Sequence, residues 1–467
     1  MTLSARSSIR LFILTLATLV GFTAMVATAN ADRSFSLRYS ANETGSLVGI
    51  GNSNMTCPTA SSGCSTARDA TPPTTANGSL NNDNWNMTWV DADSDSGTFN
   101  SSSSTLAVPS GSTIQYAALY WGGRDGGSNK NQVKFKVPGG SSYQTVTAST
   151  IDTISGGNNS GIYQAFADVT NLVKVLPSSG NGTYTVADIQ GSTGQKMMAG
   201  WSLIVVYKNP SETMKNITVF DGLVAVDSSS SATINVSGFL TPPSGPINAK
   251  AGFITWEGDM GIVGDSAKLN GVTLSDSRHP ANNFFNSSIS HDGVSDTARN
   301  PAYSNNLGFD AAWMTPPGGS IGNNATSATI KVDTSGDAFV PGVMTFQVEI
   351  LSPKIEQTKT ATDDNGGNLE QGDTITYKIA GKNTGADGTA NFVLRDPIPS
   401  DTTYVPGSIK INKSGGAPTG AQTDASGDDR AEYDSVNKRV IARLGVDPTP
   451  PSVVTSPLVR STRSPSR

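Results

Sequence analysis

Along much of the chain, apolar residues alternate with polar ones at every second position. Between residues 374 and 382, Ile375, Tyr377 and Ile379 fall on one face of an extended segment, and the positions between them are polar. A period of two predicts a β-strand with one buried face. Gly, Asn and Pro residues separate this segment from its neighbours and favour turns. The pattern therefore predicts an antiparallel, immunoglobulin-like β-sandwich over residues 353–446.

A longer series of short strands is predicted between residues 32 and 352. The segment 200–207 is apolar at nearly every position, which predicts a strand buried on both faces. Helical periodicity is limited to residues 168–176, where Asp168 can cap a short helix. We expect one large, jelly-roll-like β-sandwich, so the fold class is all-β. The predicted strands cover residues 113–121, 132–137, 183–189, 200–207, 216–226, 232–236, 249–257, 328–332 and 343–351.

The chain begins with the features of a secretory signal peptide. Arg6 and Arg10 precede an apolar run over residues 11–27, and a small-x-small cleavage pattern follows at residues 29–31. This order predicts removal of residues 1–31 and a mature chain that begins near Asp32. An uncleaved membrane anchor is the alternative, because the apolar run is long for a signal core. No later stretch is apolar enough to span a bilayer, so we expect no transmembrane helix in the mature chain.

Residues 447–467 differ in composition from the rest of the chain. They contain five Pro and five Ser and lack both aromatic residues and a two-residue alternation. This composition predicts a disordered tail and leaves the small sandwich without its closing strand. A frameshift or premature stop in a longer repeat protein would explain such an end, and a native disordered tail is the alternative.

Five short runs in the small sandwich, in this order, resemble the bacterial surface repeat catalogued as domain of unknown function eleven. The resemblance covers about the last quarter of the chain and implies an immunoglobulin-like stalk module of large exported proteins. The runs are TKT at 358–360, QGDTITY at 371–377, KNTG at 382–385, RDPIP at 395–399 and YVPGS at 404–408.

The large region is similar to the amino-terminal domain that precedes such repeats in bacterial surface proteins. Four runs support this likeness: YWGG at 120–123, YQAFADVT at 163–170, GWSLIVVY at 200–207 and VFDG at 219–222. The resemblance implies a cell-surface location.

Composition and charge limit the possible partners. Charged residues make up only 15% of the chain, and the net charge is −6 with an isoelectric point near 5.1. Nucleic-acid phosphates require clustered Lys and Arg, and none occur in the body of this chain. We therefore expect the cell envelope or an extracellular ligand as partner, and no nucleic acid.

Cys57 and Cys64 are separated by six residues in the run CPTASSGC. In an oxidising compartment such a pair forms a disulfide that closes a small loop. Metal ligation or a reactive thiol is the alternative, but neither Cys has a His or a second Cys pair nearby.

Asp91, Asp93 and Asp95 place carboxylates at alternate positions before Gly97, a pattern that can surround Ca²⁺. The helix-loop-helix calcium pattern is incomplete, because no Glu stands at the twelfth position. The alternative is a solvated acidic turn. Calcium is the one candidate cofactor. A second acidic group, Glu257, Asp259 and Asp265, is most simply an acidic loop at a sheet edge.

Lys359 is a candidate for an isopeptide crosslink, which many surface sandwiches form between a Lys and an Asn beside a buried carboxylic acid. The Asn of such a bond usually lies on the last strand, which the sequence does not predict here. A solvent-facing strand lysine is the alternative.

Candidate catalytic residues are few, because His279 and His291 are the only histidines. The runs GDS at 264–266 and DSRH at 276–279 imitate two blocks of a serine esterase. In that α/β family the blocks lie near opposite ends of the chain, whereas here they are about a dozen residues apart in a β-rich context. We therefore expect a coincidence and no catalytic residues.

The sequence favours an exported bacterial cell-surface protein with a structural or adhesive function and no catalytic activity. A secreted carbohydrate-binding module or glycan-directed enzyme is the alternative, since aromatic rings and acidic loops on sandwiches suit sugars. An exposed row of Trp on one sheet would support that alternative, and buried Trp would oppose it. The candidate rings are Trp85, Trp89, Trp121, Trp256 and Trp313.

Overall fold

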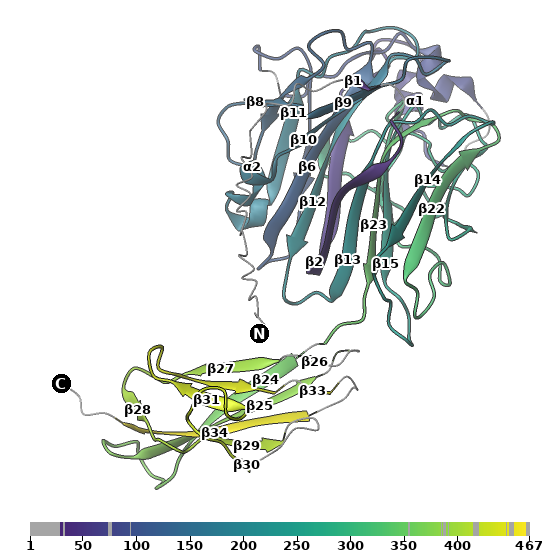
Figure 1. The fold of residues 1–467 in the computed structure, drawn as a ribbon. Helices are drawn as coiled ribbons and strands as arrows, with labels where there is room; N and C mark the ends of the chain where they lie inside the picture. The colour runs from purple at the N-terminus through teal and green to yellow at the C-terminus, as the bar shows by residue number, and fades with distance from the viewer. Residues whose placement is uncertain are drawn as a thin grey trace, which may run out of the picture.

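The computed structural model is nearly all β-strand, so the all-β fold class is confirmed. Figure 1 shows a large unit, formed by the described residues up to 353, and a small unit that follows it. Of the predicted signal peptide, all but Ala29–Asn30 lies outside the described residues. The structure describes residues 29–30, 33–72, 77–93, 95–353, 355–383, 385, 389–390, 392–413, 420–444, 446–447 and 453–463.

One long strand, β2 (Ser36–Ser53), joins two halves of the central sheet of the large unit. Its residues 45–53 pair with β12 (Ala199–Lys208), and its residues 36–44 pair with β13 (Met214–Asp221). The first half continues from β12 through β6 (Thr113–Arg124), β10 (Ile162–Asp168), β9 (Thr150–Thr153) and β1 (Ala29–Asn30). The second half continues from β13 through β23 (Val340–Glu349), β15 (Ala249–Trp256), β21 (Phe309–Met314), β18 (Ile289–His291) and β19 (Val294–Ser295).

Two smaller sheets cover the outer faces of these halves. In Figure 1, β8 and β11 lie to the left of the long central strands, and β14 and β22 lie to the right. The five-stranded sheet holds β20 (Arg299–Asn300), β5 (Ser101–Leu106), β11 (Gly182–Ala187), β7 (Gln132–Lys136) and β8 (Gln144–Thr147). The four-stranded sheet holds β14 (Ser231–Ser237), β22 (Ser327–Thr334), β16 (Asp265–Leu269) and β17 (Val272–Thr273).

Side-chain alternation along β12 shows how these layers stack. Trp201, Leu203 and Val205 lie in the core shared with the five-stranded sheet. Ile204 and Val206 point the other way, into a core shared with β15, β21 and β23. A further core lies between the second half and the four-stranded sheet. The region that the sequence predicted as one large sandwich therefore consists of two sandwiches stacked face to face, and β12 is buried on both sides as predicted.

The other predicted elements of the large unit are also present. All nine predicted strands occur, with ends shifted by a few residues, and the predicted helix is the short α2 (Thr170–Lys174). The remaining short elements are β3 (Met55–Thr56), α1 (Cys64–Asp69), η1 (Gly78–Leu80), η2 (Asn82–Asn84), β4 (Thr88–Trp89) and η3 (Ser178–Gly180).

The small unit is a two-sheet sandwich. Ile375 and Ile379 of β25 are buried as the alternation predicted, and Tyr377 is half-buried. One sheet holds β24 (Ile355–Asp363), β25 (Thr374–Asn383), β34 (Val453–Arg463), β29 (Lys410–Lys413), β30 (Gly420–Ala421) and β28 (Thr402–Tyr404). The other holds β27 (Val393–Pro397), β32 (Arg439–Arg443) and β31 (Ala431–Asp434), and β26 (Thr389–Ala390) pairs with β33 (Val446–Asp447).

The prediction of a disordered tail over residues 447–467 is wrong for residues 453–463, which form β34. This strand pairs with β25, β28 and β29 and so supplies the closing strand that the sequence did not predict. Its pairing register with β25 shifts beside Pro457, which has no backbone N–H to donate to the neighbouring strand. Composition did not predict this strand because its hydrogen-bond partners lie on three distant segments.

Candidate functional site

The predicted disulfide is present. Cys57 and Cys64 are joined at a sulfur–sulfur distance of 1.96 Å with their Cα atoms 5.7 Å apart, and both residues are fully buried. The bond fixes the segment between β3 and α1 against the core of the first sandwich.

We expect replacement of both Cys57 and Cys64 by Ser to lower the free energy of unfolding by about 2–3 kcal/mol, because the short loop is no longer closed in the unfolded chain. Denaturant unfolding of the oxidised wild type and the double variant measures this loss. The reduced wild type is the control and should behave like the variant.

Two of the three predicted calcium ligands meet at one hydroxyl group, and the third contacts a backbone N–H. Asp91 and Asp93 both accept the hydroxyl proton of Ser101, at 2.8 and 3.0 Å, and Asp93 also accepts from the Tyr143 hydroxyl. Asp95 instead accepts the backbone N–H of Gly97. Across the described residues, no group of three or more His, Cys, Asp or Glu is placed to hold a metal ion. The three carboxylates accept local hydrogen bonds, and calcium binding at this turn stays a prediction.

Lys359 forms an ion pair instead of facing solvent freely. Its Nζ lies 2.5 Å from Oδ1 of Asp396 and 4.6 Å from the ring centre of Tyr377. The Asn that an isopeptide bond would need on the last strand has no counterpart, because β34 contains no Asn. Lys359 and Asp396 thus connect β24 with β27 across the small unit.

The two esterase-like runs do not meet. The Ser266 hydroxyl donates to Asp333 at 2.5 Å. The ring nitrogens of His279 lie 2.7 Å from the Phe284 carbonyl oxygen and 2.7 Å from the Ser290 hydroxyl. His279 is buried, and burial lowers its pKa. The arrangement fixes a neutral histidine in the core and does not form a Ser–His–Asp triad from these runs.

The tryptophans do not form an exposed row. Trp121, Trp201 and Trp256 are fully buried, and Trp313 is 4% exposed. Trp85 and Trp89 are half-buried and packed against the core of the first sandwich. The six tryptophans all lie in the described residues, and they do not form the exposed row that sugar stacking would need.

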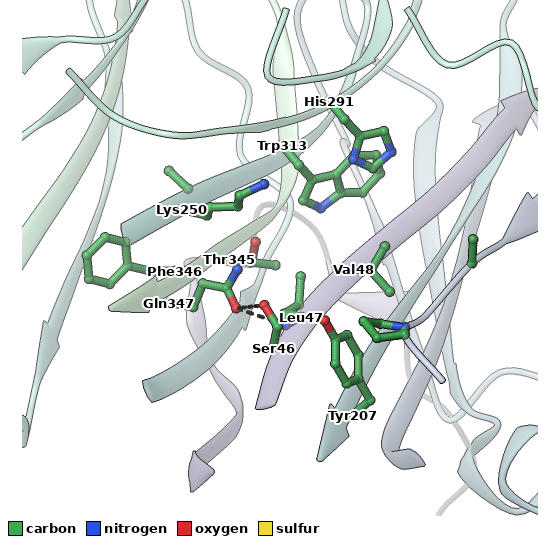
Figure 2. Close-up of a pocket in the computed structure, with 13 residues that line it drawn as sticks. Ser46, Leu47, Val48, Tyr207, Lys250, His291, Trp313, Thr345, Phe346 and Gln347 are labelled. Atoms are coloured by element: carbon green, nitrogen blue, oxygen red, sulfur yellow. Dashed lines mark hydrogen bonds between the residues drawn. The ribbon is translucent and has the colours of Figure 1, made fainter. Parts of the chain in front are cut away.

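A pocket of about 280 Å³ lies where the two halves of the central sheet separate. Figure 2 shows side chains from β2, β12, β15, β18, β21 and β23 around it. At its base the Oε1 atom of Gln347 accepts hydrogen bonds from the Ser46 hydroxyl at 2.9 Å and from the Leu47 N–H at 2.8 Å. These contacts orient the Gln347 amide between β23 and β2.

The aromatic wall of this pocket consists of Trp313 and His291. Their rings stack with centres 4.8 Å apart and planes 13° apart. A Cβ on Gly49 or Gly252 would lie within 2.5 Å of the Trp313 ring, so these two glycines allow the ring to pack against both halves of the sheet. The Trp313 ring is therefore covered by protein and does not offer an open face to a ligand.

The charges around the pocket are largely neutralised. Lys250 Nζ is paired with Asp292 at 2.7 Å. Burial lowers the pKa of His291, so the imidazole is neutral near pH 7. Such a pocket can hold a small neutral polar group by hydrogen bonds. Sequence reasoning missed Gln347 and Ser46, because they lie on two strands, β23 and β2, that are far apart in the chain.

The acidic group at residues 257–265, which the sequence predicted as an acidic loop at a sheet edge, is buried. Glu257, Asp259 and Asp265 are 7%, 4% and 0% exposed. Glu257 accepts from the Asn82 amide at 2.9 Å and lies 3.8 Å from Arg124. Burial raises the pKa of Glu257 and of Asp259. The two carboxyl groups therefore lie inside the protein and not on an open cleft, where a glycosidase would need them.

Comparisons with known proteins give little information. No family model matches the chain, and no curated protein matches it. The chain is similar to a solved protein described under "The Triple Jelly Roll Fold and Turret Assembly in an Archaeal Virus", with 9% identity over 95% of this chain and 98% of that one. The TM-score of 0.15 is too low to support any argument. Within the described residues, no helix has the length and apolar character needed to cross a membrane.

Proposed function

We propose that the protein is an exported structural or adhesive component of a bacterial cell surface, without catalytic activity. The large unit would face outward, and the small unit would act as a stalk. The buried Cys57–Cys64 disulfide is the observation that carries this proposal, because structural disulfides form and persist in oxidising compartments outside the cytoplasm.

The architecture agrees with such a function. The stacked β-sheets enclose extended apolar cores, and Ser266 and His279, which imitate catalytic motifs, are used in hydrogen bonds within the fold. The carbohydrate-directed alternative has less support, because four of the six tryptophans are buried, Trp85 and Trp89 are half-buried, and Glu257 and Asp259 are buried.

We expect the full chain, expressed in its bacterial host, to be found in the medium or to be removed from intact cells by external protease, with its two thiols oxidised. Cell fractionation with protease treatment and thiol labelling measures both properties. A cytoplasmic enzyme carried through the same steps is the control. Retention of a reduced chain inside protease-resistant cells would contradict the proposal.

A further inference from the structure

The pocket between the two halves of the central sheet has a polar wall on β23. On one face of this strand Val343 is packed in the core that the two halves share, and Thr345 and Gln347 follow at every second position. Both line the pocket, and both are 4% exposed. This face thus changes from apolar to polar where the two halves separate. Buried polar groups need hydrogen-bond partners, so these two side chains are candidates for ligand contacts.

A glycine places Thr345 beside the aromatic wall. Gly252 of β15 is paired with Thr345 on one side and with Trp313 of β21 on the other, so the three residues form one row across the sheet. A Cβ on Gly252 would clash with Oγ1 of Thr345 and would lie 2.8 Å from Nε1 of Trp313. Because Gly252 has no side chain, the Thr345 hydroxyl and the Trp313 ring nitrogen both lie over its backbone.

The Gln347 amide has a fixed orientation. Its Oε1 accepts hydrogen bonds from the Ser46 hydroxyl and from the Leu47 N–H, at 2.9 and 2.8 Å. Turning the amide would place its NH₂ group against the Leu47 N–H, which is also a donor, so Nε2 must lie on the other side. Figure 2 shows this nitrogen directed toward Thr345. Nε2 of Gln347 is therefore a donor that points into the pocket.

These side chains present polar groups that have no hydrogen-bond partner among the described residues. The groups are Nε2 of Gln347, the hydroxyl of Thr345 and Nε1 of Trp313. Nε1 of Trp313 is closed to solvent, whereas the other two are open to the pocket. An amide nitrogen can only donate, but a hydroxyl can donate and accept. The open part of the pocket therefore offers a fixed donor and, about one strand step away, an acceptor.

This pair of groups is complementary to an uncharged secondary amide. The carbonyl oxygen of such an amide would accept from Nε2 of Gln347, and its N–H would donate to the Thr345 hydroxyl oxygen. Among the described residues that line the pocket, Lys250 is the one charged group, and it is paired with Asp292 at 2.7 Å. The pocket therefore favours a neutral group over an ion.

The shape of the site favours a chain over a single ring. A second cavity, of about 350 Å³, joins the first and shares four lining residues with it: Ser46, Tyr207, Lys250 and Gln347. Together the two cavities reach the range of about 300–1,000 Å³ that is usual for ligand pockets. A sugar ring would need an open aromatic face, but the Trp313 ring is covered by His291 and by the two glycines beneath it. An extended peptide, in contrast, carries an amide at every residue along its length.

We propose that this pocket binds a short, uncharged stretch of extended peptide, with one backbone amide held by Gln347 and Thr345. The inference goes beyond the proposed surface function, because it assigns a binding site and a class of ligand. It depends on the geometry of the pocket and not on the location of the protein.

The test uses the full chain, with N-acetyl-trialanine amide as the probe, in a ligand-observed NMR titration. We expect saturable binding with a dissociation constant of roughly 0.1–1 mM, as suits so small a ligand. Thr345→Val removes the hydroxyl but keeps the side-chain shape, and should weaken binding about tenfold. Thr233→Val is the matched control, because Thr233 is exposed on β14 in the outer sheet, and it should bind the probe like the wild type.

A methylated probe tests the hydrogen bond to Thr345 directly. The same peptide methylated at its amide nitrogens has no backbone N–H to donate. It should bind the wild type about tenfold more weakly than the first probe, with a much smaller difference for Thr345→Val. Equal losses in the two proteins would overturn the contact with Thr345. Ala107→Phe enlarges an exposed residue of the pocket wall and should abolish binding of both probes.

The absence of saturable peptide binding to the wild type would overturn the proposal, and this result does not depend on the folding of any variant. Binding of triacetylchitotriose without binding of the peptide would also overturn it, because the amide recognised would then belong to an acetylated sugar. Neither result bears on export, which the cell fractionation tests separately.

Discussion

Replacing Trp256 by Ala should lower the free energy of unfolding by about 3–5 kcal/mol, the range for large aromatic residues removed from a core. Trp256 is fully buried between the two halves of the central sheet. Its Nε1 donates to Oε1 of Gln164 at 3.2 Å, and its ring centre lies 5.0 Å from that of Phe309. A Cβ on Gly122 would lie 2.8 Å from the Trp256 ring, so the ring packs directly against the backbone of β6. Because a backbone strand moves little, we expect the cavity left by Trp256→Ala to stay largely open.

Chemical unfolding followed by circular dichroism measures the effect of Trp256→Ala. Trp85→Ala is the control, since Trp85 is half-buried and its loss should cost much less. A loss of under about 1 kcal/mol for Trp256→Ala would show that the two sandwiches are not tightly packed against each other.

Stability should fall as the pH rises from about 4 toward 10, with Asp337 as a main cause. Asp337 is 3% exposed, and its Oδ2 accepts the N–H of Asp259 at 3.0 Å. Burial raises its pKa to about 10, and the charge of Asp259 contributes in the same direction. The unfolded chain loses this proton near pH 4, whereas the folded chain keeps it. The folded state therefore binds more protons, and each pH unit costs on the order of 1.4 kcal/mol.

Asp337→Asn should make this slope shallower, because Asn imitates the protonated acid, while the other buried carboxyl groups with raised pKa keep their share of the slope. Urea unfolding at about pH 5, 7 and 9 measures the slope in both proteins. Asp333→Asn is the control. Burial by itself would raise the pKa of Asp333, but hydrogen bonds from Lys268, Ser266 and Lys331 outweigh it and lower this pKa to about 2. Asp333 is thus charged in both states across this range. Stability that stays constant or rises with pH in the wild type would contradict the prediction.

Local patterns in the sequence predicted the strands well because each strand carries its own alternation. The segment 200–207 is apolar at odd-numbered and at even-numbered positions, and in the structure its two faces lie in two different cores. The pairing of Cys57 with Cys64 was predictable for a similar reason, since the two residues are close in sequence. By contrast, β5 (Ser101–Leu106) is rich in Ser and was not predicted, although several of these Ser residues are buried.

The candidate sites were predicted less well. Asp91, Asp93 and Asp95 had the spacing of a cation loop, but Ser101 and Tyr143 use the first two carboxylates. Asp265 was expected at a sheet edge, and its contact with Phe285 places it in the interior. Spacing along the chain could not show either outcome, because Tyr143 and Phe285 reach these carboxylates only through the fold.

By itself the sequence determined the all-β class, most strands of the large unit and the short disulfide loop, because these depend on periodicity and on neighbours within a few residues. Only the tertiary structure decided that the large unit is two stacked sandwiches, that β34 closes the small unit, and that Gln347 and Ser46 meet in one pocket. Each of these features depends on which distant strands pair and which faces meet. That choice is made by the total burial of apolar surface and by the pairing of backbone groups across the fold, and a local pattern does not contain it.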